Sequence, residues 1–415
     1  MSSQTDDRPL ADPHPSTEGA AATTGEIRRP WRTALLNALP AWLSGLVLLL
    51  VIERLAEAHN GRRLEMGLSG DSVNYPFHLL FTWDTHWYLA LSERGYQGNS
   101  HDGIRFSPLL PLATRAVSAV GIPADVAILA VCWTAALGFA VLMHRVALLE
   151  TGSLVTARRA AWLSQLAPGA FVLGMGYTEA LTGLLAAAYL LAVRQYGADL
   201  DVRRRLLWFS VGFVAGFGSG LVRPTGVMIA AVGGIEIVMR LLRRERLGRA
   251  GWLARLGMTA APVLGVGSFL LWCHAVYGQY LLPYTAQTES GLRGTIAGNP
   301  FLSAWQIFST PTSKGEVNGI GTITIALVVA SIGLLWFCAR RMPVSFTVWA
   351  TLCLVAALTA PLFTSFARYL SGDLPLLITA AALTRSRTSW LWTVGASAAL
   401  FAFFAYRAFT GAYTP

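Results

Sequence analysis

The stretch PADVAILAVCWTAALGFAVLMHRVAL, residues 123–148, decides the fold class. Between Asp125 and Arg145 it contains no Asp, Glu, Lys or Arg. About 20 consecutive apolar residues cross the hydrocarbon core of a bilayer as a helix, which satisfies its own backbone hydrogen bonds there. The stretch therefore predicts a transmembrane helix.

The rest of the chain repeats this composition. Of its 415 residues, 54% are hydrophobic and 13% are charged, whereas about a quarter of the residues in a soluble domain are charged. Apolar runs of similar character recur, and we predict eleven spanning helices at roughly 33–52, 123–148, 157–176, 178–195, 205–222, 224–242, 254–277, 318–338, 343–362, 373–385 and 388–408. This pattern predicts an all-α polytopic membrane protein and excludes an ordinary water-soluble globule.

The N-terminal segment has a different composition. Residues 1–30 are polar and rich in Pro, Ser, Thr and Ala, so they bury too little apolar surface to fold alone. No small-residue cleavage site follows the first apolar run, which argues against a cleaved signal peptide. We expect a disordered cytoplasmic tail over 1–30 and a single transmembrane domain over 31–415.

The net charge of +10 comes from 31 Arg and one Lys. Most of these arginines lie in short connections between apolar runs, where they set orientation and do not indicate nucleic-acid binding. If Arg28, Arg29 and Arg32 hold the N-terminus in the cytoplasm, the even-numbered connections return there. Basic clusters lie in those connections: Arg145, Arg158 and Arg159; Arg194 and Arg203 to Arg205; Arg240 to Arg255; Arg340 and Arg341; Arg385 and Arg387.

Five polar segments remain for the outer face. They are a long first loop (53–122), GYTEA (176–180), VRPTG (222–226), a second long loop (278–317) and SFARYLSGD (365–373). Ionisable residues at the ends of apolar helices are costly and mark functional candidates. Because all five segments fall on one face, we predict a site at that surface.

The first of these segments contains FTWDTHWYLALSERGY, residues 81–96. If 84–94 form a helix, Asp84 stands at its start, where a carboxylate can cap the free amides. Trp87, Tyr88 and Leu91 share one helix face, which would suit lipid headgroups. An aromatic belt alone does not need the Asp, and a carboxylate partly shielded among rings can instead serve as a general base.

Residues 107–121 follow, and they are too short and too polar at Arg115 to span. We predict an in-plane interfacial helix, preceded by an extended start at Pro108 and Pro111. This places in-plane helices on the first outer loop.

These residues carry a family resemblance. WDTHWYLALSERGY followed by FSPLLPL is similar to the Trp-Asp, aromatic, Gly-Tyr and Phe-Phe-Pro-x-x-Pro-Leu signature of the PIG-V family of mannosyltransferases, within the GT-C class of multi-spanning glycosyltransferases. The chain departs from this pattern at Thr82, where the family carries Arg, and at Ser107, where it carries Phe. The resemblance continues through GYTEAL, VRPTG and ARYLSGDLPL.

The resemblance implies a GT-C-like enzyme that moves a sugar, mannose, from a polyprenyl-phosphate donor to a hydroxyl of a lipid- or glycan-linked acceptor on the outer leaflet. Asp84 matches the first-loop acid that acts as general base, and the reaction inverts the anomeric centre. The implied partners are the lipid-linked sugar donor, a glycolipid or glycan acceptor and membrane lipids. The implied location is a cell membrane with an extracytoplasmic active site, in a bacterial cytoplasmic membrane or in an endoplasmic reticulum membrane.

Such a reaction needs cations for the leaving phosphate but no cofactor. We predict Arg368 and Arg223 for this role, with snorkelling or an ion pair to Asp373 or Glu179 as the alternative. Glu179 is either a site carboxylate that binds the acceptor or a first-turn residue of a helix capped by Thr178.

The remaining candidates for acceptor or sugar binding are aromatic or polar. We assign Trp83, Trp87, Tyr88, Tyr369 and His86 to this group, although a solvated loop position is the alternative for His86. The second long loop adds side chains suited to sugar stacking and hydrogen bonding: Tyr280, Tyr284, Trp305, Gln279, Gln287 and Glu289. His101 and Asp102 have no third ligand at a suitable spacing, so no metal is predicted.

A membrane transporter or flippase for a lipid-linked or small polar solute is the alternative function. Transport predicts ionisable residues and broken helices at mid-membrane, whereas the acids and arginines here fall at one interface. Glu236 lies near the cytoplasmic end, where we expect it to pair with Arg240 at i+4. The cysteines, Cys132, Cys273, Cys338 and Cys353, lie in apolar segments and predict no disulfide.

Overall fold

A computed structural model describes residues 30–60, 77–99, 101–197, 200–245, 247–288, 298–309, 319–360 and 363–413. Over these residues the chain consists of helices joined by turns and short loops, without a strand. The predicted all-α fold class is confirmed. The predicted tail, apart from Pro30, lies outside the described residues.

Seven helical segments among the described residues are long and apolar enough to cross a membrane. They are α2 (Pro30–Asn60), α5 (Ala124–Thr151), α8 (Val202–Val222), η5 (Pro224–Ile229) with α9 (Ala230–Leu242), α10 (Arg249–Tyr277), α13 (Gly319–Arg341) and α17 (Arg387–Phe409). The other four predicted runs contain shorter helices, α6 (Leu154–Leu166), α7 (Glu179–Gln195), α14 (Val344–Leu358) and α16 (Leu374–Leu383).

The run predicted as one helix over 157–176 is divided in the structure. Helix α6 ends at Leu166, two residues before Pro168, and a short 3₁₀ helix, η4 (Ala170–Gly174), follows. Proline disfavours the helical conformation in the residue before it. A continuous spanning helix at this position was therefore a wrong prediction. The chain breaks after α6, and η4 is buried inside the protein.

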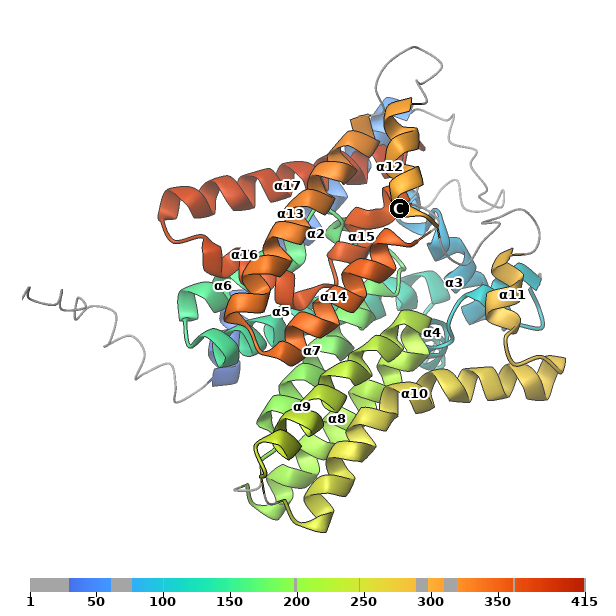
Figure 1. Cartoon of the computed structure of the whole chain (residues 1–415). Coiled ribbons are helices and arrows are strands. Elements are labelled where there is room, and N and C mark those ends of the chain that lie inside the picture. The colour runs from blue at the N-terminus through green and yellow to red at the C-terminus, as the bar shows by residue number, and fades with distance from the viewer. Residues whose placement is uncertain are drawn as a thin grey trace, which may run out of the picture.

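The helices form two groups (Figure 1). Helices α8, α9 and α10 lie side by side, and the later helices α13 to α17 lie together on another side of α5 and α7. At one end of the molecule lie three short helices, α3 (Asp84–Arg94), α4 (Leu109–Ser118) and α11 (Leu282–Thr288). The remaining short helices are η2 (His78–Phe81), η3 (His101–Arg105), α12 (Pro300–Ser309), η6 (Phe363–Ser365) and α15 (Phe366–Leu370).

The short helices agree with most of the predicted boundaries. Helix α3 has the predicted bounds, and α4, with 10 residues, is too short to span. Helix α2 runs on to Asn60, beyond the predicted start of the first loop at 53. The extended start before α4 was wrong, because Pro108 is already in the α-helical region and Pro111 lies in the first turn, where a missing N–H costs no helical hydrogen bond.

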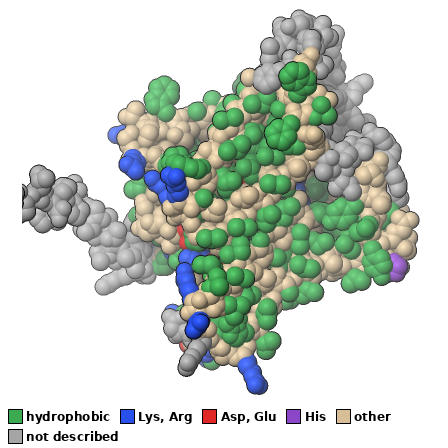
Figure 2. All heavy atoms as spheres, viewed as in Figure 1, with side chains coloured by type: hydrophobic (Ala, Val, Ile, Leu, Met, Phe, Trp, Pro, Cys, Tyr) green, Lys and Arg blue, Asp and Glu red, His purple; other side chains and the backbone are tan. Residues whose placement is uncertain are grey.

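Charged and apolar side chains are separated on the face of the molecule that Figure 2 shows. Figure 2 shows Lys and Arg side chains gathered along the left and lower edges of the visible face, while hydrophobic side chains cover its middle. This is the distribution expected where one edge faces water and the middle faces lipid.

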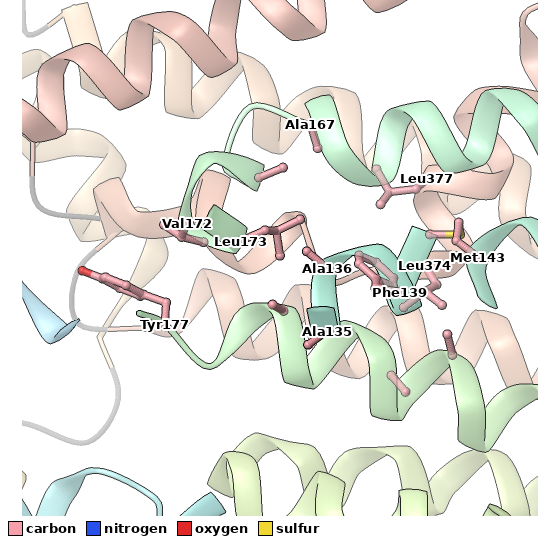
Figure 3. Packing of buried hydrophobic residues seen from close by; sticks show 14 of the residues in the cluster. Ala135, Ala136, Phe139, Met143, Ala167, Val172, Leu173, Tyr177, Leu374 and Leu377 are labelled. Carbon is pink, nitrogen blue, oxygen red and sulfur yellow. The ribbon is translucent and has the colours of Figure 1, made fainter. Parts of the chain in front are cut away.

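The packed interior centres on α5. Phe139 and Met143 of α5 lie close to Leu374 and Leu377 of α16 in this core (Figure 3). Small residues are frequent here, and Ala135 and Ala136 are nearly inaccessible. Small side chains let membrane helices approach closely, which strengthens their van der Waals contact. All four cysteines are free, and three of them are buried.

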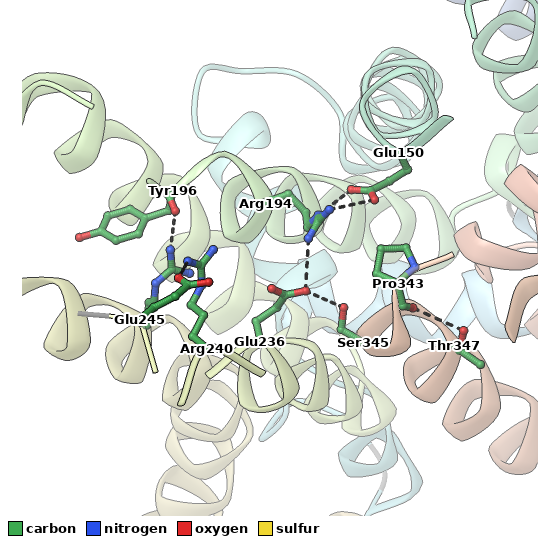
Figure 4. Close-up of polar contacts among 10 residues, drawn as sticks. Glu150, Arg194, Tyr196, Glu236, Arg240, Glu245, Pro343, Ser345 and Thr347 are labelled. Carbon is green, nitrogen blue, oxygen red and sulfur yellow. Dashed lines mark hydrogen bonds and ion pairs between the residues drawn. The ribbon is translucent and has the colours of Figure 1, made fainter. Parts of the chain in front are cut away.

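The helix ends that the arginine pattern assigns to the cytoplasm lie together (Figure 4). Arg194, near the end of α7, pairs with Glu150 of α5 at 2.7 Å and with Glu236 of α9 at 3.4 Å. Ser345, at the start of α14, donates a hydrogen bond to Glu236 at 2.8 Å. Four separate elements are thus tied at one side of the molecule.

The pairing of Glu236 with Arg240 was a wrong prediction. Arg240 instead binds Glu245, and Glu236 is held by partners from α7 and α14 (Figure 4). The i+4 spacing permits a pair on one helix, but tertiary packing supplied nearer partners.

A close crossing joins α8 and α10. A Cβ atom added to Gly220 would lie 2.1 Å from the carbonyl oxygen of Pro262, whereas one added to Gly267 meets nothing within 4 Å. The backbones of the two helices therefore meet at Gly220, and only a residue without a side chain fits there.

Replacing Gly220 with Ala should destabilise the protein by about 1–3 kcal/mol, because the added methyl group separates α8 from α10. Gly267→Ala, on the open side of α10, should leave stability unchanged or raise it by up to about 1 kcal/mol through helix propensity. Thermal unfolding of both variants in the same detergent measures the difference. Equal melting temperatures would contradict the close crossing.

Candidate functional site

The start of α3 is held by contacts with distant parts of the chain. Trp83 has φ 59° and ψ −132°, a combination that side chains disfavour. Its indole Nε1–H donates to the carbonyl oxygen of Ala408 in α17 at 3.1 Å. The next backbone N–H, of Asp84, donates to the hydroxyl oxygen of Tyr177 at 3.2 Å. Tertiary contacts therefore offset the strain and orient the first turn of α3.

Four charged residues form an alternating chain, which we call the ion-pair chain: Asp84, Arg368, Glu179 and Arg223. Arg368 Nη1 lies 3.0 Å from Asp84 Oδ2, and its Nε lies 3.3 Å from Glu179 Oε1. Arg223 Nη1 lies 2.8 Å from the same Glu179 oxygen. Two carboxylates and two guanidinium groups balance one another in charge.

The centre of this chain is buried and its ends are open. The side chains of Arg368 and Glu179 are 2% and 4% exposed, whereas those of Asp84 and Arg223 are 33% and 20% exposed. Removing two ions from water is costly unless each has a close partner. Arg368 and Glu179 therefore stabilise each other in the interior, while Asp84 and Arg223 are more open to the space in which a ligand would bind.

Separate elements bring these residues together. Asp84 begins α3, Glu179 begins α7, Arg223 follows α8, and Arg368 lies in α15. A Cβ atom added to Gly169 would lie 2.0 Å from the carbonyl oxygen of Ala367. The break between α6 and η4 therefore lets the backbone pass directly against α15.

Tyrosine side chains lie beside the ion-pair chain. Arg368 Nη2 donates to the hydroxyl oxygen of Tyr369 at 3.2 Å, and the guanidinium of Arg223 lies 5.0 Å from the centre of the Tyr369 ring. Burial raises the pKa of Tyr88, and the nearby Asp84 carboxylate raises it further. Tyr88 therefore keeps a neutral hydroxyl group.

A cavity of about 490 Å³ opens beside the ion-pair chain. Its charged and polar lining comes from the ion-pair chain itself, together with Tyr88 and Arg105. Its apolar lining comes mainly from η5 and α14, through Met228, Ile229, Trp349, Leu352, Val355 and Ala356. The lining of the cavity is thus amphiphilic, because separate elements supply its charged and its apolar side chains.

All five outer segments of the sequence reach this cavity. Asp84 comes from the first loop, Glu179 from GYTEA, Arg223 from VRPTG, Tyr284 from the second loop and Arg368 from SFARYLSGD. Segments that are separated by several helices in the sequence therefore line one cavity.

The structure also shows which contacts the charged candidates make. Both arginines pair with Glu179, and Asp373 instead accepts the backbone N–H of Leu376 at the start of α16. The side chain of Thr178 makes no cap hydrogen bond. Asp84 directs its carboxylate to Arg368 and does not cap its own helix.

Three aromatic or histidine candidates lie away from the main cavity. The side chain of Trp83 packs towards α17, as described above. Trp87 stacks on Phe106 with ring centres 5.7 Å apart, and His86 and Trp87 line a second hollow of about 260 Å³. The helix face proposed to lie on headgroups was wrong for Tyr88 and Leu91, because both are buried.

The second loop contributes only in part. Tyr284 and Gln287 line the cavity, Tyr280 stacks on His274, and Trp305 is exposed. Glu289 lies outside the described residues. Within the described part of the chain, no three His, Cys, Asp or Glu side chains gather as metal ligands would.

Sequence reasoning missed Arg105, Tyr177 and the wall formed by α14. Arg105 directly precedes the FSPLLPL stretch, and Tyr177 directly precedes the Thr-Glu of GYTEA, so proximity to those motifs was an available signal. The residues of α14 carried no such signal, because a cavity wall and a lipid-facing surface have the same apolar composition.

Comparisons with known proteins give distant structural similarity. A crystal structure of the Archaeoglobus fulgidus oligosaccharyltransferase tethered to an acceptor peptide matches with a TM-score of 0.48 and 14% identity, over 90% of this chain and 55% of that one. ArnT from Cupriavidus metallidurans bound to undecaprenyl phosphate matches with a TM-score of 0.49 and 14% identity, over 78% and 71%. This chain thus spans little more than half of the oligosaccharyltransferase. No family model and no curated protein matches the sequence.

Replacing Glu179 with Gln should destabilise the protein by about 3–5 kcal/mol, because it leaves two arginines near each other without their shared carboxylate. Glu93→Gln removes the same charge from an exposed position on α3 and should change stability by less than about 0.5 kcal/mol. Thermal unfolding of the two purified variants tests this. If both melted like the unmodified protein, the buried pairing would be refuted.

Proposed function

We propose that the protein is a membrane glycosyltransferase of the GT-C class that transfers a sugar, mannose, from a polyprenyl-phosphate donor to a hydroxyl group of a lipid- or glycan-linked acceptor. The observation that supports this function is the amphiphilic cavity, which is lined both by Asp84 and two arginines and by apolar residues of η5 and α14. The family resemblance of the motifs that line it points to the same reaction.

The donor, like the cavity lining, combines a charged part with an apolar part. Its phosphate is anionic and suits Arg368 and Arg223, because guanidinium groups bind phosphate oxygens through paired hydrogen bonds. Its polyprenyl chain is apolar and suits the wall of η5 and α14, where Val355 is both a lining residue and half exposed. A lipid can therefore enter from the side of α14 while its phosphate reaches the arginines.

The chemistry follows from these positions. Asp84 takes the proton from the acceptor hydroxyl group while that oxygen attacks the anomeric carbon. The bond between the anomeric carbon and the phosphate oxygen breaks, and its electron pair leaves with the lipid phosphate. Attack from the face opposite the leaving group inverts the anomeric centre. The arginines stabilise the negative charge that develops on the phosphate.

Other cavity residues suit the sugar and the acceptor. The neutral hydroxyl group of Tyr88 and the side chain of Gln287 can hydrogen-bond to sugar hydroxyl groups. Tyr369 orients Arg368 and adds an aromatic ring beside Arg223. Trp87 and His86 line the second hollow, where a longer acceptor could extend past Phe106.

The proposed active site lies on the extracytoplasmic side of a cell membrane. The ion-pair chain joins the helix ends opposite to those that carry the arginine clusters, because Glu179 begins α7 and Arg194 lies near its end. The positive-inside rule assigns the arginine side to the cytoplasm. A lipid-linked donor would then be used on the outer leaflet of that membrane.

Asp84→Asn should lower the transfer rate by about 10²–10⁴-fold, because an amide cannot accept the proton. The assay follows radiolabelled mannose from a polyprenyl-phosphate mannose donor into candidate glycolipid acceptors, with purified protein in lipid. Glu93→Gln serves as the charge-matched control and should retain full activity. Wild-type turnover by the Asn variant would remove Asp84 from its role, and solute flux without any transfer would favour a transporter.

Ala356→Trp should raise the KM for the lipid donor by about tenfold or more, because the indole fills the space along the apolar lining of the cavity. Val329→Trp, at an exposed position of α13 that does not line the cavity, should leave the KM unchanged. Initial rates at varied donor concentration distinguish the two variants. An unchanged donor KM in Ala356→Trp would exclude this wall as the lipid path.

A further inference from the structure

Asp84 has two roles that conflict in the structure as it stands. In the proposed reaction it must face the acceptor hydroxyl group, yet its Oδ2 lies 3.0 Å from Arg368 Nη1. Arg368 is also one of the two cations proposed to bind the donor phosphate. The guanidinium group of Arg368 therefore pairs with the Asp84 carboxylate before the donor binds and with the donor phosphate afterwards.

We infer that the donor phosphate and the Asp84 carboxylate are exchangeable ligands of Arg368, so that donor binding displaces Asp84 and frees it to act as the base. This inference rests on the proposed function and describes how that site is regulated. It makes the reaction ordered, with the lipid donor bound before the acceptor is deprotonated.

The contacts of Arg368 show which partner can leave. Its three nitrogen atoms face Asp84, Tyr369 and Glu179. Glu179 is buried and is also held by Arg223 at 2.8 Å, so its departure would leave two guanidinium groups unpaired. Asp84 has no second ion pair among the described residues and is the most exposed member of the ion-pair chain. It is therefore the ligand that an incoming anion can replace.

Repulsion between anions at Arg368 favours replacement over addition. The ion-pair chain is neutral, Arg105 adds one positive charge to the cavity lining, and the donor phosphodiester adds one negative charge. If Asp84 stayed on Arg368, two anions would share one guanidinium group at close range and repel each other. If Asp84 turns away, the donor phosphate takes its place at Nη1 of Arg368. The Asp84 carboxylate then points into the cavity, where the acceptor hydroxyl group is expected.

The backbone permits this turn without a larger movement. The N–H of Asp84 is held by the hydroxyl oxygen of Tyr177, and the preceding Trp83 is held by Ala408. These contacts do not involve the Asp84 carboxylate, so only its side chain needs to change rotamer. The exchange therefore needs an ion pair to break and a side chain to rotate, but no movement of the backbone.

The exchange also explains how the cycle closes. During transfer the acceptor proton moves to Asp84, the sugar forms its new bond to the acceptor oxygen, and the lipid leaves as a phosphate monoester with one more negative charge than the donor. This product binds the arginines until it departs, after which Asp84, having passed its proton to water, pairs with Arg368 again. The lipid phosphate product should therefore compete with the donor.

Removing the competing carboxylate should strengthen the binding of a lipid phosphate. We expect Asp84→Asn to bind farnesyl phosphate, a short polyprenyl phosphate, about tenfold more tightly than the unmodified protein, even though the variant transfers sugar far more slowly. Equilibrium titration of each purified protein in lipid nanodiscs measures the Kd. Farnesyl phosphate is the probe. Farnesol, which lacks the phosphate, reports the binding of the hydrocarbon tail alone.

Two variants serve as controls for this titration. Glu93→Gln removes one negative charge from the exposed face of the same helix and should leave the Kd within about twofold, which separates a local exchange from a general charge effect. Arg368→Gln should weaken binding by about tenfold or more, because it removes the shared cation. Size-exclusion profiles establish that each variant is folded before titration.

The outcomes separate the exchange from the function it rests on. If the unmodified protein transfers sugar and Asp84→Asn binds farnesyl phosphate no more tightly than it does, the exchange is wrong and the proposed function stands. If the unmodified protein neither transfers sugar nor binds farnesyl phosphate more tightly than farnesol, both proposals fail. If Glu93→Gln strengthened the binding of farnesyl phosphate as much as Asp84→Asn, the exchange would also be wrong, because Glu93 does not pair with Arg368.

Discussion

The structure depends on one buried carboxylate, Glu179, which holds two arginines from distant parts of the chain. Arg223 follows α8 and Arg368 lies in α15, and neither could remain in this apolar interior without an anion close by. Their shared partner therefore determines where α7, α8 and α15 meet. The cavity exists at this meeting point, since the outer members of the ion-pair chain face into it.

Different elements supply the polar and the apolar lining of the cavity. Charged residues come from helix ends and short helices, whereas apolar residues come mainly from the second half of α14 and from η5. A membrane helix can supply an apolar wall at no cost, because its surface is already apolar. The charged lining, by contrast, depends on ion pairs between its side chains, on a strained backbone at Trp83 and on the close approach of Gly169 to α15. This asymmetry suits a ligand with a charged head and a lipid tail.

The candidate site could be located from the sequence to the level of segments but not of contacts. Asp84, Glu179, Arg223 and Arg368 stood out because ionisable residues are rare at the ends of apolar runs. Which of them pair was not predictable, since Asp373 and Glu179 were equally available in sequence as partners for the arginines. Trp83, although next to Asp84, directs its indole to Ala408, because the strained turn before α3 faces its side chain away from the cavity.

The sequence by itself determined the membrane class, most of the helix positions and the separation of arginine-rich connections from the polar outer segments. These follow from local composition, because a run of apolar residues behaves the same way wherever the chain folds. Only the tertiary structure decided that Glu236 pairs with Arg194 and that α14 lines the cavity. Those outcomes depend on which groups come within a few ångströms of each other, and no local pattern encodes that distance.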